Sequence, residues 1–551
     1  MTRRETLGLM LWMLIWLPHR GAGEAASVSP SAVEIKQVTT QKVFDDLVRA
    51  IGDGRTRPDL RLLGRLETGR SRGVWYSPDR NVVTLEEQAY DLCASLKADS
   101  LHALAFLLGH ELAHWYRDHG WVHDFGSAHA DLGVGQVLGQ RSRDPAERVR
   151  METEADYFGG FFAHIAGYRS LEVAGEVLPR LYTAYGLGED LRGYPSLPER
   201  QEIARRARQE LDRMVPVFEA GRLLLLVKRY EEAARCFGAV ARTFPSREIL
   251  NNAGVARALE AVDLFDQGEL EVAYPLELDA QTRLRTGSKA SEYGPGDRRR
   301  LRRALVREAR ELFEQARQRD DQYLPGRVNL AAATDLAGEP FEALALAHQA
   351  VRMAQKQSAD PDLGPALIVR GIARLHTGDE AGARQDFEAA EPASPALAQL
   401  NLAFLDDALP PVADRPARTA AGPETIDAAT PRERCHSVVA APTAMGEVPA
   451  VDRGQPAIDI YTAEGADWTA LVVEAGYGAY YFLETRPGYA GQSAAGVRLG
   501  DGLSRVREAY GPASYLVAAR QGTYHIYADS GMILHLDALE TVQGWAIYDS
   551  E

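Results

Sequence analysis

The stretch His110-Glu111-Leu112-Ala113-His114 lies inside the apolar run Leu101–Tyr116 and is the most informative part of the chain. Residues four apart lie about 40° from each other around an α-helix, so both imidazoles face the same side. Two imidazoles at this spacing can bind one Zn²⁺, and Glu111 then points toward a water in the open coordination position. The metal acidifies that water, and the carboxylate can take its proton and later deliver it to a leaving amine. The alternative is two hydrogen-bonded structural histidines on a half-buried helix.

A second helix downstream can supply the third protein ligand that zinc requires. Asp144 as N-cap and Pro145 at the first helical position predict its start, and we expect it to run to Gly167. On this helix Glu152 and Asp156 are four residues apart and share a face. One of the two can bind the metal while the other orients a ligand histidine.

A third ligand from the first helix itself is not expected. The metzincin arrangement would need a glycine at Arg117 and a histidine at Gly120. His119 lies nine residues after His110, which places it about 180° around a continuing helix and away from the metal.

The two motifs together resemble a known group of metallopeptidases. His-Glu-x-x-His, followed about forty residues later by Glu-x-x-Ala-Asp, is similar to the gluzincins that include the CAAX prenyl protease, HtpX, OMA-type and BepA-type enzymes. The resemblance covers roughly residues 40–210. It implies one Zn²⁺ per chain held by His110, His114 and Glu152, with Asp156 as the supporting acid. Glu154, on a different face from Glu152, is the other candidate ligand.

A third family feature, His-Pro-Ser followed shortly by Arg, is present with one departure. The chain has Tyr194-Pro195-Ser196 and then Arg200, so the histidine position holds a tyrosine. The resemblance implies a catalytic role for Arg200 and Tyr194 together with Glu111. A tyrosine hydroxyl could still donate to an oxyanion.

The resemblance also implies a function and a substrate class. It predicts a zinc-dependent endopeptidase that hydrolyses protein or peptide substrates in envelope protein quality control. The alternative is a latent or inactive peptidase that acts as a chaperone or adaptor.

The N-terminus predicts export. Arg3 and Arg4 precede the apolar stretch Leu7–Leu17, Pro18 interrupts it, and small residues follow at Ala22–Ala26. Eleven apolar residues are too few to span a bilayer of about 30 Å as a helix. We therefore expect residues 1–25 to be a signal peptide and the mature chain to be periplasmic. Membrane association would be peripheral or through an uncleaved N-terminus.

The net charge and the cysteine content argue against some classes of partner and against a disulfide-rich fold. The net charge of −16 argues against nucleic acid or an anionic membrane as the main partner. The cysteines are few, odd in number and far apart, which indicates lone thiols and no disulfide framework: Cys93, Cys236 and Cys435.

The predicted fold class is multidomain α+β. Residues 26–211 are expected to form a mostly helical zincin-type peptidase domain with a small antiparallel sheet. Val82–Leu85 is a candidate edge strand to which an extended substrate could add, and an interior strand is the alternative.

The pattern changes to helical repeats over residues 212–405. Ala-x-x-x-Phe pairs recur as Ala233/Phe237, Ala309/Phe313 and Ala383/Phe387, which resembles tetratricopeptide (TPR) units. We expect three to five hairpins stacked in a solenoid, with a polar insertion at about 267–300 that ends in the basic cluster Arg298–Arg303. The concave side would bind a peptide or a protein partner; the alternative is a scaffold that only covers the peptidase.

The last part of the chain predicts a linker followed by a small module. Residues 406–456 are rich in Pro, Ala, Thr and Asp, and read as a linker. Residues 457–551 alternate strand-like segments with the short amphipathic helix Leu503–Tyr510, which indicates a small α+β module.

Overall fold

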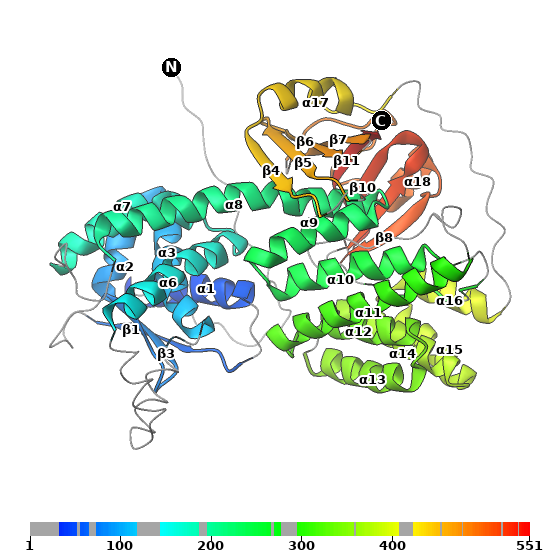
Figure 1. Ribbon diagram of the computed structural model, residues 1–551, viewed down its shortest axis with the longest axis horizontal. Coiled ribbons are helices and arrows are strands. Elements are labelled where there is room, and N and C mark those ends of the chain that lie inside the picture. The colour runs from blue at the N-terminus through cyan, green and yellow to red at the C-terminus, as the bar shows by residue number, and fades with distance from the viewer. Residues whose placement is uncertain are drawn as a thin grey trace, which may run out of the picture.

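The computed structural model describes residues 32–51, 55–64, 73–117, 119, 144–186, 195–265, 269–270, 272–276, 295–357, 360–406, 423–451, 455–476, 478–486, 488–519, 522–537 and 539–550. The chain is a multidomain α+β protein, which confirms the predicted class at this level (Figure 1). The predicted signal peptide and Tyr194 lie outside the described residues. Among the helices that the structure describes, none is both long and apolar enough to cross a membrane.

The first part of the chain combines helices with a small sheet. Its helices are α1 (Ala32–Ile51), α2 (Glu87–Ala94), α3 (Ser100–Tyr116), α6 (Pro145–Ile165) and α7 (Ser170–Tyr185). Its strands are β1 (Asp59–Leu63), β2 (Val74–Ser77) and β3 (Val82–Glu86).

Two predictions about this sheet were wrong. The strand order is β1-β3-β2, with β1 parallel and β2 antiparallel to β3, so the sheet is mixed. The segment Val82–Leu85 is therefore an interior strand, and Val83 and Leu85 are fully buried. Strand β2 pairs with β3, lies at an edge of the sheet and packs against α3.

A long run of helices follows. They are α8 (Leu197–Leu226), α9 (Tyr230–Thr243), α10 (Arg247–Val262), α11 (Pro295–Arg319), α12 (Leu324–Leu336), α13 (Pro340–Gln357), α14 (Asp360–His376), α15 (Glu380–Ala390) and α16 (Pro395–Leu405). Each helix packs against the next, so the described helices pair as α8/α9, α10/α11, α12/α13 and α14/α15. The expected boundary between residues 211 and 212 falls inside α8, and one helix therefore belongs to both parts of the molecule.

The same side-chain contact recurs in three of these pairs. A glycine on the first helix faces a phenylalanine on the second, and a Cβ built on the glycine would meet the ring at 3.0 Å or less: Gly221/Phe237, Gly254/Phe313 and Gly371/Phe387. In the pair α12/α13 the residues at the same separation are Ala331 and Ala347, both fully buried. Small residues thus let the two helices of each pair approach closely.

The C-terminal part is one antiparallel sheet of eight strands, in the order β4-β5-β6-β7-β11-β10-β9-β8. The strands are β4 (Ala444–Val448), β5 (Ile458–Glu464), β6 (Trp468–Ala475), β7 (Gly478–Thr485), β8 (Tyr515–Ala519), β9 (Gly522–Tyr527), β10 (Met532–Leu536) and β11 (Val542–Ser550). Two helices accompany it, α17 (Pro431–Ala440) and α18 (Leu503–Tyr510), and α17 packs on β5, β6 and β7.

The predicted linker over 406–456 is too long, because α17 and β4 lie within it. A local signal was present. Thr430, Pro431 and Glu433 form a capping box with proline at the first helical position. The module therefore includes α17 and Glu424, which accepts from the amide of Ala494 and from the hydroxyl of Tyr510, and does not begin at residue 457.

Helix α8 connects all parts of the molecule. Its first half packs on α6 and α7, and its second half packs on α9 and on β4 (Figure 1). Arg222 on α8 forms an ion pair of 2.6 Å with Glu484 on β7, and Tyr515 Oη on β8 donates to the carbonyl of Leu226 at 3.1 Å. The three cysteines are free and buried, as predicted.

Candidate metal centre

The helix α3 is almost entirely buried, and its histidines are therefore presented inside the fold. His110 and Glu111 are each 7% exposed. The helix ends at Tyr116, with Arg117 as C-cap. Such burial of polar side chains requires partners, because an unpaired buried polar group costs free energy.

Helices α3 and α6 touch through their backbones beside the histidines. A Cβ built on Gly159 would lie 2.6 Å from the backbone nitrogen of His110, and one on Gly109 would lie 2.7 Å from the carbonyl oxygen of Gly159. No larger side chain fits at this crossing. The contact brings Glu152 and Asp156 of α6 within reach of His110.

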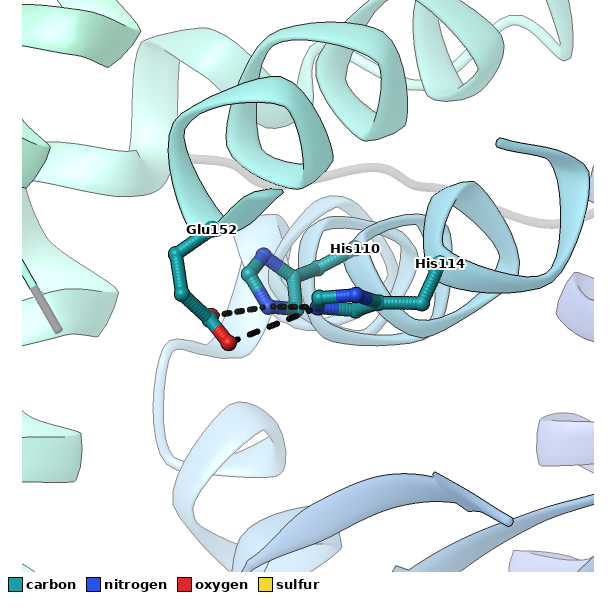
Figure 2. Close-up of side chains that lie close together, drawn as sticks. All are labelled: His110, His114 and Glu152. Atoms are coloured by element: carbon teal, nitrogen blue, oxygen red, sulfur yellow. Dashed lines mark hydrogen bonds and ion pairs between the residues drawn. The ribbon is translucent and has the colours of Figure 1, made fainter. Parts of the chain in front are cut away.

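Three side chains from the two helices converge, as Figure 2 shows: His110 and His114 from α3 and Glu152 from α6. The Nε2 atoms of the two histidines are 3.2 Å apart. Glu152 Oε2 lies 3.1 Å from His110 Nε2, and its Oε1 lies 3.7 Å from His114 Nε2.

These separations fit a tetrahedral metal ion. Ligand atoms that each lie about 2.0–2.2 Å from zinc at tetrahedral angles are about 3.3 Å apart. The three observed distances of 3.1, 3.2 and 3.7 Å lie around this value. Two imidazole nitrogens and one carboxylate are also the donor set of one class of catalytic zinc sites.

Asp156 holds the outer nitrogen of His110. Its Oδ1 lies 2.8 Å from His110 Nδ1, and Arg200 at the start of α8 donates to both of its oxygens at 2.8 and 2.6 Å. Burial alone would raise the pKa of Asp156, but Arg200 and then His110 lower it to about 2. The Asp156 carboxylate is therefore ionised and orients His110 with Nε2 toward the cluster.

The outer nitrogen of His114 is held by His119, which is not part of the three-residue cluster but does not point to the opposite side of the helix as predicted. His119 Nδ1 lies 2.9 Å from His114 Nδ1, and His119 Nε2 lies 3.3 Å from Glu154 Oε2. The helix ends at Tyr116, and the amide of His119 donates back to the carbonyl of His114 at 3.1 Å. The rotation of 100° per residue therefore no longer applies at residue 119.

Glu154 lies outside the three-residue cluster. Besides His119 it accepts from Arg117 Nε at 3.0 Å and forms an ion pair with Arg150. Burial opposes ionisation of Glu154, but His119 and the arginines lower its pKa. Of the two candidate ligands, Glu152 is the one that faces the histidines.

Glu111 is fixed by the sheet. Its Oε2 accepts a hydrogen bond of 2.8 Å from the backbone amide of Tyr76 on β2. The sequence gives no signal for this contact, because Tyr76 and Glu111 are 35 residues apart and the partner is a main-chain group. The carboxylate is thus held by the main chain of β2, and it is close enough to His110 to raise the pKa of that imidazole.

The acids around His110 also govern its protonation. Burial disfavours the charged imidazole, but Asp156, Glu152 and Glu111 raise the pKa of His110 to about 10. Burial likewise opposes ionisation of Glu152, but His110 and His114 lower its pKa. A cation is therefore favoured at this position, and a divalent ion would displace the proton from His110.

The structure brings together His110, His114, Glu152, Asp156 and Glu111 as the sequence motifs indicate. Arg200 lies behind Asp156, so we describe it as a positioning residue. Tyr194 lies outside the described residues.

Neither a protein-family model nor a curated protein matches the chain. Any functional proposal therefore depends on the chemistry of the cluster.

Proposed function

We propose that the chain is an exported zinc-dependent metalloendopeptidase of the gluzincin type that acts on protein substrates. The observation that carries this proposal is the convergence of His110, His114 and Glu152 beside the carboxylate of Glu111. Zinc bound there would polarise the scissile carbonyl and acidify a water molecule. Glu111 would take the proton from this water and deliver it to the leaving amine.

Strand β2 supports a polypeptide substrate. It is the edge strand next to α3, and the amide of its Tyr76 contacts Glu111. An extended segment that paired along β2 would therefore run past the general base. Dipeptides could not use this edge, so we expect longer peptides to be cleaved faster.

The remaining parts support recruitment of clients. The helix pairs from α8 to α16 follow the pattern of TPR-like units, and such arrays bind peptides or proteins on their inner face. The apolar N-terminal segment and the family resemblance support a role in the periplasm, in protein quality control of the envelope.

The proposal is tested by metal content and by cleavage of an unfolded protein. We expect wild type and Glu111→Gln each to bind one zinc, and we expect cleavage to be lost about 10²–10⁴-fold in the variant. Glu176→Gln on the exposed face of α7 is the matched control and should cleave like wild type. Equal cleavage by wild type and Glu111→Gln would refute the proposal. Zinc bound without turnover in wild type would favour the latent chaperone.

A further inference from the structure

The insertion between α10 and α11 contains a buried apolar pentapeptide, Val272-Ala273-Tyr274-Pro275-Leu276. We call it the insert segment. It belongs to no helix or strand, yet Val272, Ala273 and Leu276 are only 1%, 0% and 3% exposed. The prediction of a polar insertion over about 267–300 is therefore wrong for these residues.

One asparagine pairs with the main chain of the insert segment. Asn401 Oδ1 on α16 accepts from the amide of Ala273 at 2.9 Å, and Asn401 Nδ2 donates to the carbonyl of Ala273 at 3.0 Å. Asn401 is itself 1% exposed. The amide and the carbonyl of Ala273 are thus both hydrogen-bonded, as they would be to a neighbouring strand. This pairing does not depend on the side chain of the bound residue.

A second contact is specific for the side chain of Tyr274. Its hydroxyl donates to Asp335 Oδ2 on α12 at 2.6 Å, and the same oxygen lies 2.7 Å from Nδ1 of His376 on α14. Asp335 Oδ1 is buried and has no hydrogen-bond partner among the described residues. An acid with one unpaired buried oxygen has capacity for a further donor.

These contacts come from the first helices of successive pairs. Asp335 lies on α12, His376 on α14 and Asn401 on α16. The insert segment contacts α12 through Asp335 and α16 through Asn401, and His376 on α14 shares the Asp335 oxygen with Tyr274. The segment therefore spans more than one helix pair, as a bound peptide crosses a helical array.

We infer, building on the recruiting role proposed for the helices, that the face formed by α12, α14 and α16 binds extended polypeptide and that the insert segment occupies it as an internal competitor. The ligand is an unfolded stretch with a small residue, then an aromatic hydroxyl, then apolar residues. Because the competitor is covalently attached, its effective concentration is in the millimolar range, and a client must exceed its affinity or displace it with a longer contact.

The test measures binding of a labelled synthetic peptide that spans residues 270–278, in the Glu111→Gln background so that cleavage cannot interfere. In one protein the insert segment is intact; in the released protein it carries Tyr274→Ser and Leu276→Ser. We expect the released protein to bind the peptide at least 10-fold more tightly than the intact one. In the released protein, Asn401→Ala should weaken binding about 10-fold, whereas Gln399→Ala on the exposed face of α16 should not.

Two altered peptides test whether binding depends on the peptide sequence. A scrambled peptide should not bind, and a peptide with Phe in place of Tyr274 should bind about 10-fold more weakly, because it lacks the hydroxyl donor to Asp335. This second arm changes only the peptide and does not depend on the folding of a variant. Equal binding by intact and released proteins, or equal binding of the scrambled peptide, would overturn the inference. Absence of zinc or of cleavage would refute the peptidase proposal and leave this measurement unaffected.

Discussion

The hydrogen bonds around the cluster assign one tautomer to each imidazole. If Nε2 of His110 and His114 faces a metal, Nδ1 of each must carry the proton. His110 then donates to Asp156, and His114 donates to Nδ1 of His119. His119 in turn carries its proton on Nε2 and donates to Glu154. Every donor thus meets an acceptor, and both imidazoles are held in the orientation that a metal requires.

The two acids near the histidines should therefore differ in their effect on metal binding. Glu152→Ala should remove stoichiometric zinc, because a ligand is lost. Glu154→Ala should keep one zinc but lower its affinity about 10–100-fold, as expected when a partner of a ligand is removed. Competition titration against a chelator measures both. If Glu154→Ala lost the zinc while Glu152→Ala kept it, the ligand would have to be reassigned.

Arg200 should matter for stability as well as for metal binding. Asp156 is 1% exposed, and removal of Arg200 would leave the buried carboxylate with the His110 imidazole as its remaining described partner. We expect Arg200→Met to lower the free energy of unfolding by about 3–5 kcal/mol, measured in urea. The control is Arg206→Met on the same helix, whose exposed pair with Glu202 is screened by solvent and should contribute little to stability. Similar losses in both variants would contradict a special role for the buried pair.

At this scale the sequence predicts the motif residues well and their neighbours poorly. Spacing is sufficient to place His110 and His114 on one face of a helix. It fails for His119, because the position depends on where α3 ends, and for Tyr76, because a main-chain donor carries no residue type. Such contacts follow from tertiary packing.

Among the elements, the crossing of α3 and α6 limits the geometry of the cluster most directly. We expect Gly159→Ala to push the helices apart, to cost about 1–3 kcal/mol of stability and to weaken zinc binding, because the added Cβ meets backbone atoms that cannot move aside. Thermal unfolding and a zinc titration measure the two effects. Gly238→Ala on α9 is the control, since a Cβ there meets nothing within 4 Å. Zinc affinity equal to that of the control would mean that the crossing tolerates a side chain.

The C-terminal sheet should lose stability in acid through His525 on β9. Burial, and then Arg507, lower the pKa of His525 to about 4. Between pH 6.5 and pH 4 the unfolded chain binds a proton that the folded chain does not, so the stability present above pH 6.5 falls as the pH decreases. The loss amounts to at most about 3 kcal/mol. His525→Gln should make the unfolding free energy, measured in urea at several pH values, less dependent on pH in this range.

Some helices and strands could be predicted from the sequence and others could not. The short helix Leu503–Tyr510 was predicted at the bounds that α18 has in the structure. The helix α17 was missed although Thr430 and Glu433 form a capping box, because the proline-rich stretch around them dominated the composition. The pairing of β3 was misjudged because a short apolar strand looks the same at an edge and in the interior.

In the whole molecule, α8 is the common support. It carries Arg200 near one end and Arg222 near the other, and the ion pair of Arg222 with Glu484 joins residues 262 positions apart. No local pattern in the sequence could predict this docking of sheet on helix. The helices that carry His110, His114 and Glu152, the helical array and the sheet therefore share one packed core.

A chain that ends at residue 422 should expose part of this core. Val217 and Leu226 on α8 are 4% and 0% exposed in the complete chain, and Val217 lies against Gly446 of β4. Without the sheet we expect self-association and binding of an apolar dye. Analytical ultracentrifugation and dye fluorescence, compared with the full chain, measure this. A monomeric truncated protein that bound no dye would show that α8 does not need the sheet.

The order of strands in the sheet has a consequence for biosynthesis. β11, the last strand to leave the ribosome, pairs with β7 on one side and with β10 on the other. The four strands β4 to β7 and the three strands β8 to β10 can form hairpins during translation, but only β11 joins the two groups. Synthesis of β11 is thus the step at which the sheet becomes continuous, and a premature stop codon before residue 542 would leave its two parts separate.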